Sequence, residues 1–150
     1  MREFGQRLVW SQDSASGEIH QEIIFALIKT SDLKRTEEIN LGRAASLRKK
    51  IENEGKWNNP ILLERESKAV MDGNHRLWVA HNLGLQCVPC ILLYYGNRHL
   101  QLSSWSKGQA VSPNQVVSAG LTGALLGYKT TKHDLLLDLS YPTYSLDELL

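Results

Sequence analysis

Asp72, Gly73, Asn74, His75 and Arg76 form the stretch of this sequence whose residue types are best suited to bind phosphate. A strand is predicted to lead through this acid and glycine into the start of a helix. The free N–H groups at a helix start carry the positive end of the dipole, Gly73 allows close approach to the backbone, and the Arg76 guanidinium matches phosphate oxygens. Asp72 is a candidate magnesium ligand. An ordinary turn, in which Asp72 caps the helix and Arg76 pairs on the surface, explains the same spacing equally well.

Two further segments hold groups that could act on a substrate. Glu37 and Glu38 stand where a loop is predicted to enter a helix, so one of them could be a general base, or both could complement the helix dipole. The stretch Lys129-Thr-Thr-Lys-His133 brings hydroxyls, amines and an imidazole together, which suits a carboxylate or phosphate ligand. A solvated polar loop has the same composition. The residues alone leave these alternatives open.

Cys87 and Cys90 form a C-x-x-C pair, which could be a redox dithiol or half of a zinc site. The sequence has no second C-x-x-C and no close histidine pair to complete a metal site. The pair opens a β-rich run rather than a helix, so no helix dipole would lower the thiol pKa. We therefore expect two buried, reduced strand cysteines.

Composition restricts the class of protein. The chain has 150 residues, 42% of them hydrophobic, and a formal net charge of +1, which predicts one globular domain without a global charge to attract a polyanion. The longest apolar run, 87–95, is too short to span a bilayer, and the first residues do not resemble a signal peptide, so we expect a cytoplasmic protein without a membrane partner. The spacing in 123–130 does not fit a P-loop, and no zinc-protease or α/β-hydrolase motif is present.

Hydrophobic periodicity predicts helices and short strands in alternation, which indicates an α+β domain. Residues 1–20 are expected to be an N-terminal extension or peripheral arm, and 21–150 the domain itself. The predicted strands are 22–28, 60–63, 68–72, 88–95 and 99–105. The predicted helices are 37–54, 75–83, one that starts at Ser112-Pro113 with Val116, Val117 and Leu121 on its apolar face, and a last one opened by a capping box at 145–148.

Several segments, taken in order, resemble the ParB N-terminal/sulfiredoxin superfamily over about residues 23–95. They are Leu33-x-x-x-Glu37, Pro60-Ile-Leu-Leu, Met71-Asp-Gly-Asn-His-Arg76, and Leu83-Gly84 through Val88-Pro89. Together with Ser104-Trp105 and 129–133, the 72–76 stretch looks most like the free L-serine kinase branch of that superfamily. In the usual pattern of this branch a histidine stands in place of Asn74 and an arginine in place of Lys132. The reactive cysteine of sulfiredoxin falls on Asn74, which disfavours sulfiredoxin chemistry.

The resemblance implies a small mixed sheet with flanking helices, and a kinase that phosphorylates the hydroxyl of free L-serine or a similar small hydroxy amino acid. ATP or ADP would be the phosphoryl donor, with Mg²⁺. Glu37 would be the base, and Asp72 would organise the metal and the nucleophile. The residues that would bind the nucleotide are Gly73, Asn74, His75 and Arg76. Those expected to hold the amino acid are Trp105, Thr130, Thr131 and His133.

The alternative is a ParB-like nucleotide-binding or DNA-associated regulatory domain without kinase activity. Basic side chains on the predicted helix 37–54 could contact a phosphate backbone, but several acids lie on the same helix, which favours a solvated mixed-charge face. DNA binding in ParB proteins ordinarily uses a separate helix-turn-helix, and no clean pair of recognition helices follows residue 95. A nucleic-acid partner is therefore expected only under this alternative.

Overall fold

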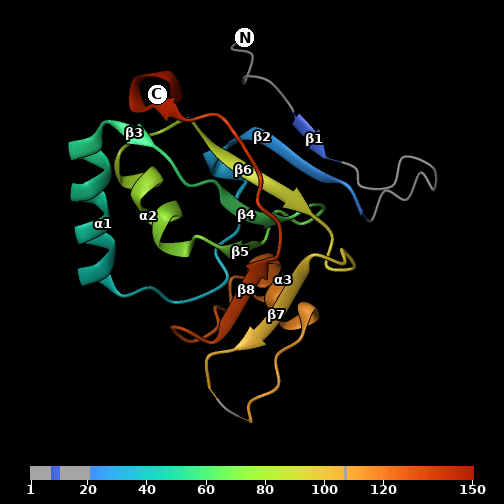
Figure 1. Cartoon of the computed structure of the whole chain (residues 1–150). Helices are drawn as coiled ribbons and strands as arrows, with labels where there is room; N and C mark the ends of the chain where they lie inside the picture. Colours follow the sequence, from blue (N-terminus) through green and yellow to red (C-terminus); the bar gives the residue numbers. More distant parts are fainter. Residues whose placement is uncertain (1–7, 11–20, 107) are drawn as a thin grey trace.

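The computed structural model describes residues 8–10, 21–106 and 108–150. Its centre is a five-stranded sheet in the order β1-β2-β6-β4-β5, in which β4 and β6 run parallel and the other neighbours antiparallel (Figure 1). The sheet strands are β1 (Leu8–Trp10), β2 (Ile23–Lys29), β4 (Ile61–Glu64), β5 (Val70–Asp72) and β6 (Cys87–Leu93). The remaining elements are η2 (Thr30–Asp32), α1 (Leu41–Glu54), β3 (Lys56–Trp57), α2 (Asn74–Asn82), β7 (Leu100–Ser104), α3 (Pro113–Thr122), β8 (Thr131–Leu135), β9 (Tyr144–Ser145) and α4 (Leu146–Leu149). The predicted α+β class is confirmed.

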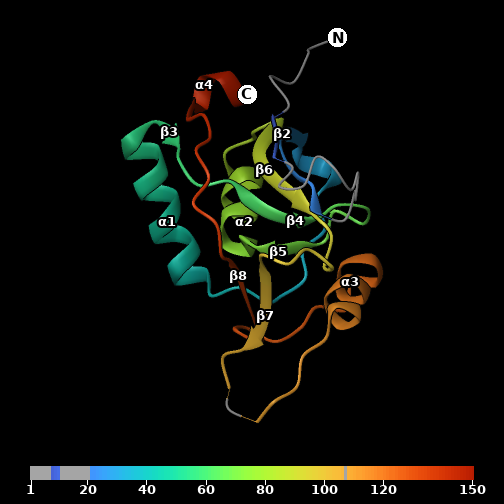
Figure 2. The same cartoon turned by 45° about the vertical axis from the view of Figure 1, so that its right-hand side comes forward.

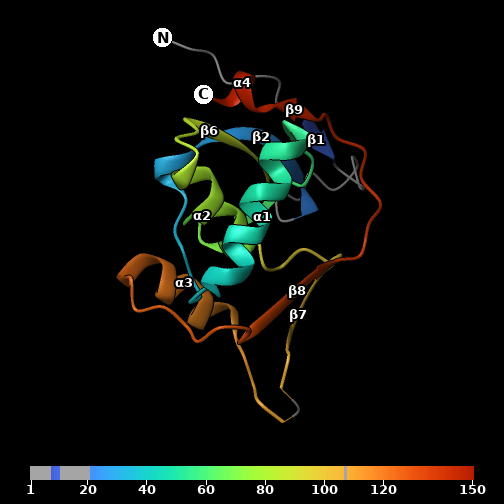
Figure 3. The same ribbon diagram turned by 90° about the vertical axis from the view of Figure 1, so that its left-hand side faces the viewer.

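One face of the sheet is covered by α1 and α2, which lie side by side on it (Figure 3). Leu77 and Val79 of α2, Ile51 of α1 and Leu149 of α4 are buried there against the strands. This layer fixes the position of both helices, since burial of apolar area is the main stabilising contribution in a domain of this size.

The opposite face is covered by the chain as it returns from β8 to β9. Phe25 of β2 is fully buried there, and its ring stacks on Tyr141 and Tyr144 with centroids 5.9 and 6.4 Å apart. All residues of β6 are buried, because this strand is paired on both edges and covered on both faces.

The antiparallel ribbon β7–β8 projects beyond the edge strand β5, with α3 beside it (Figure 2). Close approach of α3 to β5 is possible because its contact residue is Gly120, where a Cβ atom would lie 3.0 Å from the Ala69 side chain. Val116 and Ala119 form the buried face of this helix. Leu121, predicted on that face, is instead 63% exposed, so this expectation was wrong.

Two further expectations need correction. Helix α1 begins at Leu41, capped by the Asn40 side chain, so that Glu37 and Glu38 lie in the segment before the helix and not in its first turn. Part of the predicted loop 129–133 is strand β8, which pairs with β7. Of the expected N-terminal extension or peripheral arm, residues 8–10 form the edge strand β1, which pairs with β2, and the rest of residues 1–20 lies outside the described residues.

The remaining predicted elements are found close to their expected positions. Ser112 caps α3 and Ser145 caps α4, each in a capping box with the residue three positions later. Gly55 ends α1, and Gly84 follows α2, both with positive φ. Within the described residues, no helix is both long and apolar enough to cross a bilayer.

Cys87 and Cys90 are buried in β6, and neither forms a disulfide with a described residue, as predicted. Burial raises the pKa of the Cys90 thiol, which keeps it protonated and unreactive. These residues therefore act as small core side chains.

Replacement of both cysteines by serine should lower the free energy of unfolding by about 1–3 kcal/mol per site, because each hydroxyl enters an apolar strand environment. Urea unfolding followed by circular dichroism measures this loss. Unchanged stability, or stoichiometric zinc in the purified protein, would contradict the assignment of a structural, metal-free pair.

Candidate functional site

A cavity of about 880 Å³ lies where the N-terminal ends of α1 and α2 meet the start of β8. Its lining includes nearly all the residues singled out from the sequence: Glu37, Glu38, Asp72, Gly73, Asn74, His75, Arg76, Trp105, Thr131 and His133. Thr130 is not among the lining residues, and its hydroxyl donates to the Gly127 carbonyl. The structure thus brings groups from four distant parts of the chain to one place.

Glu37 is the buried carboxylate of this cavity, with 9% of its surface exposed. Its Oε2 accepts a hydrogen bond from the Thr131 backbone N–H at 2.9 Å and another from the Thr131 hydroxyl. Hydrogen bonds of this kind to an ionised group hold a carboxylate in one orientation. Glu38, in contrast, is an exposed side chain at the cavity wall.

The N-terminus of α2 faces the cavity without a capping side chain. Its N-cap is Gly73, whose φ of +122° an L side chain rarely adopts, and a Cβ atom there would lie 3.1 Å from the Ile61 side chain. Asp72 therefore does not cap the helix, contrary to the ordinary-turn alternative. The first-turn N–H groups of α2 therefore receive no side-chain cap, and a helix start of this kind is suited to bind an anion.

Arg76 lines the cavity, but its guanidinium is largely engaged by groups of the protein. One terminal nitrogen donates to the carbonyl oxygens of Asn59 and Pro60, and the other lies 3.4 Å from the Asp72 carboxylate. The side chain thus ties α2 to the segment before β4. Its expected contact with phosphate stays a prediction.

His75 links the starts of the two helices. The Asn40 backbone N–H donates to His75 Nε2 at 3.0 Å, so the proton of the neutral ring belongs on Nδ1. Burial lowers the pKa of His75, and the positive charges of Arg43 and Arg35 lower it further. The imidazole is therefore neutral at pH 7.

Basic and aromatic side chains line the outer part of the cavity. Trp105 is 55% exposed and donates its indole N–H to the Thr131 carbonyl. The ammonium groups of Lys129 and Lys132 lie 5.5 and 5.0 Å from its ring centroid, within cation–π range. Arg43 donates to the Tyr128 hydroxyl at 2.9 Å.

The sequence predicts neither Arg43 nor Tyr128 as a cavity residue, although both line it. Arg43 lies on a helix whose pattern predicts only a mixed-charge surface, and Tyr128 lies in a segment without a functional motif. Each lies in a segment whose local pattern carries no sign of the other, so no local signal could have found the pair.

His133 is buried beside Tyr95, whose hydroxyl lies 2.9 Å from His133 Nε2. Burial raises the pKa of the Tyr95 phenol, which keeps its proton and can donate it to the ring nitrogen. Burial also lowers the pKa of His133 to about 4, against the opposing effects of Asp72, the Met71 backbone and Asp134. His133 is thus an uncharged polar group at pH 7.

The oxygen ligands of the cavity fit magnesium only where the phosphates of a bound substrate supply the remaining ligands. Among the described residues, no group of three or more histidine, cysteine, aspartate or glutamate side chains could hold a metal ion. The Asp72 side chain is 64% exposed at the cavity wall and offers hard oxygen ligands. Magnesium is commonly bound by one or two carboxylates together with substrate phosphates, so Asp72 is suited to that arrangement.

The lowered pKa of His133 predicts a loss of stability in mild acid. A histidine in the unfolded chain has a pKa near 6.5, so between about pH 6.5 and 4 the unfolded state binds a proton more readily than the folded state does. As pH falls through this range, the free energy of unfolding should therefore decrease by up to about 3 kcal/mol because of His133. His133→Gln should flatten this part of the curve of unfolding free energy against pH. His81→Gln, at an exposed histidine, is the control. Equal slopes in wild type and His133→Gln would refute this origin of the acid sensitivity.

Comparison with known proteins gives both sequence relatives and a shared fold. No family model matches the chain. Over 83 residues, 53% of the chain, it is 34% identical to an ATP-dependent L-serine kinase of Staphylothermus marinus. Over 48 residues, 32% of the chain, it is 29% identical to a ParB-like protein of Sulfolobus acidocaldarius. The two matches span 33% and 24% of the relatives' own lengths.

Among solved structures, a free serine kinase in complex with AMP has the same fold. The superposition has a TM-score of 0.74 and covers 84% of this chain and 93% of that one, with 14% sequence identity. The chain therefore has the fold of a free serine kinase and is similar in sequence to proteins named ParB-like protein and ATP-dependent L-serine kinase, which confirms the resemblance to the ParB/sulfiredoxin superfamily near its serine kinase branch.

Proposed function

We propose that this protein is a nucleotide-dependent kinase that phosphorylates the hydroxyl of free L-serine or a similar small hydroxy amino acid. One observation carries the proposal: the buried Glu37 carboxylate and the uncapped N-terminus of α2 line the same cavity. A base for a hydroxyl and an anion site for phosphates are the two parts that phosphoryl transfer to an alcohol requires. The names of the sequence relatives and the shared fold support the same reaction.

Glu37 is the proposed base. With Oε2 held by Thr131, Oε1 is the oxygen left to receive the proton of the substrate hydroxyl. The hydroxyl oxygen forms a bond to the terminal phosphorus of the nucleotide, and the bond from that phosphorus to the bridging oxygen breaks. The shortened nucleotide leaves with the electron pair, and the amino acid leaves as its phosphate monoester.

Backbone N–H groups at the start of α2, from Asn74 to Arg76, are the proposed phosphate cradle. Lys129 and Lys132 add positive charge across the cavity. Bound magnesium, held by Asp72 together with the phosphates, would supply further neutralisation of phosphate charge. ATP is the first donor to test, because the curated relative is named an ATP-dependent kinase, and ADP is the second.

The amino acid is proposed to lie between Glu37 and the aromatic wall formed by Trp105. His133 remains a candidate for contact with its carboxylate, as an uncharged hydrogen-bonding group. Thr131 donates to Glu37 in this structure, so its proposed contact with substrate would come in addition to that role. A contact with Thr130 would need the Thr130 side chain to leave the Gly127 carbonyl.

The second candidate function is that of a nucleotide-binding or DNA-associated regulatory domain without kinase activity. The sequence similarity to a ParB-like protein supports it. Two of the basic residues on α1 are already engaged, Arg48 by Glu52 at 2.8 Å and Arg43 by Tyr128. This engagement favours the kinase over a DNA-binding face on α1.

Phosphorus NMR of the purified protein with magnesium, ATP or ADP, and a panel of hydroxy amino acids tests the two candidates. A phosphomonoester signal that grows only with serine or a close analogue is the expected result. The absence of any phosphomonoester, together with DNA affinity that falls steeply with salt, would instead establish the regulatory function.

Glu37→Gln should slow the chemical step by about 10² to 10⁴, because the amide keeps the shape but cannot take the proton. Nucleotide affinity should change little. Glu38→Gln is the matched control and should retain its rate, since this side chain is exposed and is not the one held by Thr131. Single-turnover phosphorus transfer measures the rate. Equal losses in both variants would exclude Glu37 as the specific base.

Magnesium should raise the affinity for nucleotide by about tenfold, and Asp72→Asn should remove most of this gain, because the variant loses a charged oxygen ligand. Calorimetric titration with ATP, with and without Mg²⁺, measures it. Asp134→Asn changes another carboxylate at the cavity, which lies 3.8 Å from the Lys132 amine, and should leave the magnesium effect in place. The same loss in both variants would mean that general charge, and not ligation by Asp72, is responsible.

A further inference from the structure

The side chain of Asn74 lies in the contact between α2 and the Glu37 segment, and it is 9% exposed. Its Oδ1 accepts from the Thr36 backbone N–H at 2.9 Å and from the Glu37 N–H at 3.4 Å. Its Nδ2 donates to the Thr36 hydroxyl at 3.2 Å, which in turn donates to the Val70 carbonyl at 2.7 Å. The amide is thus engaged on both of its polar atoms.

The sequence predicts a contact of Asn74 with phosphate through the backbone N–H of the turn, and it says nothing of the side chain. In the structure the side-chain amide is bound to the chain that carries Glu37. The Asn74 backbone N–H remains at the uncapped start of α2. Asn74 therefore contacts the backbone of Glu37 through its side chain and belongs to the proposed phosphate cradle through its own backbone.

We propose that Asn74 is a positioning residue, whose amide joins the Glu37 backbone to the first residue of α2 and so fixes the distance between the base and the phosphates. The inference rests on the proposed function for its catalytic consequence, but not for the structural coupling itself. The coupling also reaches β8, because the Thr131 backbone N–H donates to the Glu37 carboxylate and not to the Asn74 side chain. Loss of the Asn74 amide should therefore weaken the hydrogen bond at Thr131.

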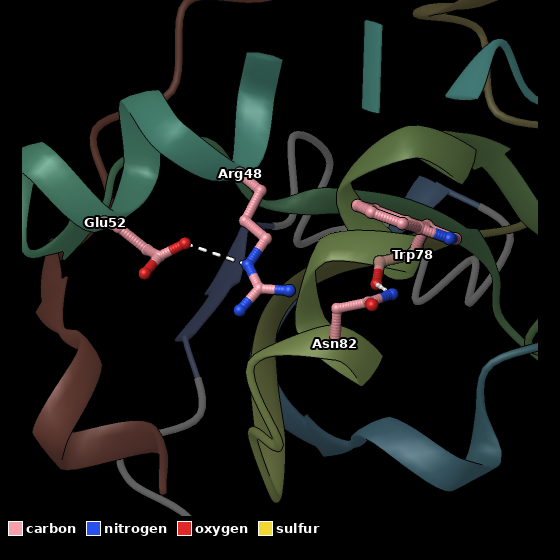
Figure 4. Close-up of polar contacts among 4 residues, drawn as sticks. All are labelled: Arg48, Glu52, Trp78 and Asn82. Carbon is pink, nitrogen blue, oxygen red and sulfur yellow. Dashed lines mark hydrogen bonds and ion pairs between the residues drawn. The ribbon is translucent and has the colours of Figure 1, made fainter. Parts of the chain in front are cut away.

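Asn74→Ala is the test, and α2 itself offers the matched control. Asn82, at the other end of the helix, donates from Nδ2 to the Trp78 carbonyl at 2.9 Å and is exposed (Figure 4). Asn82→Ala makes the same chemical change in the same helix and removes one side-chain hydrogen bond to the backbone. It leaves the Glu37 segment untouched.

Hydrogen exchange gives a readout that does not depend on activity. In Asn74→Ala the Thr131 amide should exchange about tenfold faster or more. The Val88 amide in the core strand β6 should still exchange only at the rate set by global unfolding of the variant. In Asn82→Ala both amides should behave as in wild type. Exchange of Thr131 at the wild-type rate in folded Asn74→Ala, or equal acceleration of all amides, would overturn the coupling.

Kinetics separate a positioning role from a merely structural one. Asn74→Ala should lower kcat by about 10- to 100-fold, because small displacements of a catalytic group are costly. The nucleotide dissociation constant should stay within about threefold, because the backbone N–H at position 74 is retained. Unchanged kcat per folded molecule would overturn the catalytic part of the inference.

Asn74→Asp provides a second variant that keeps the acceptor for Thr36. Thr131 should retain its protection, while the new negative charge beside Glu37 should move the acid limb of the kcat profile to higher pH. A profile identical to that of wild type would count against the contact with Glu37. If wild-type protein phosphorylates no hydroxy amino acid, the kinase proposal fails, and selective acceleration at Thr131 in Asn74→Ala would still support the coupling.

Discussion

Residues 34–38 are held in place by backbone hydrogen bonds on both sides, although they belong to none of the sheets. Lys34 forms one isolated bridge with the residue before β5, and Glu37 forms another with Leu126. Because its backbone groups are satisfied on both sides, the segment has little freedom to shift without loss of several hydrogen bonds. The cavity depends on these hydrogen bonds. They hold the buried Glu37 carboxylate between α2 and β8, in a part of the chain that has no regular secondary structure.

The charges around the cavity are separated in a way that suits two different tasks. Glu37 is buried and bound by hydrogen bonds from Thr131, whereas the Asp72 carboxylate is largely exposed and can meet a solvated cation. The lysines 129 and 132 lie over the Trp105 ring, where an aromatic face offsets part of the mutual repulsion of their ammonium groups. A site that binds an anionic nucleotide and removes a proton needs both signs of charge, each in its own environment.

Local signals explain which parts of this structure could be predicted from the sequence. The start of α2 after Gly73, and the ends of α1 and α2 at glycines with positive φ, follow from the properties of a few adjacent residues. The contact between Glu37 and Thr131 joins residues 94 positions apart, and no periodicity reports it. The sequence places Asn74 in the turn expected to bind phosphate, but only the packing of Thr36 beside α2 decides that its amide points inward.

Residues 131–133 lie in strand β8 and not in a loop, which restricts how their polar side chains can act. In a strand, successive side chains point to opposite sides, and here Thr131 and His133 are buried while Lys132 and Asp134 are partly exposed and lie 3.8 Å apart as an ion pair. A flexible loop could have turned all of these groups towards one ligand. The strand instead assigns Thr131 and His133 to the interior, where Thr131 holds Glu37, and leaves Lys132 beside Trp105 at the outer wall. The two pairs of side chains are thus separated onto opposite sides of β8, because pairing with β7 fixes which side chain faces which way.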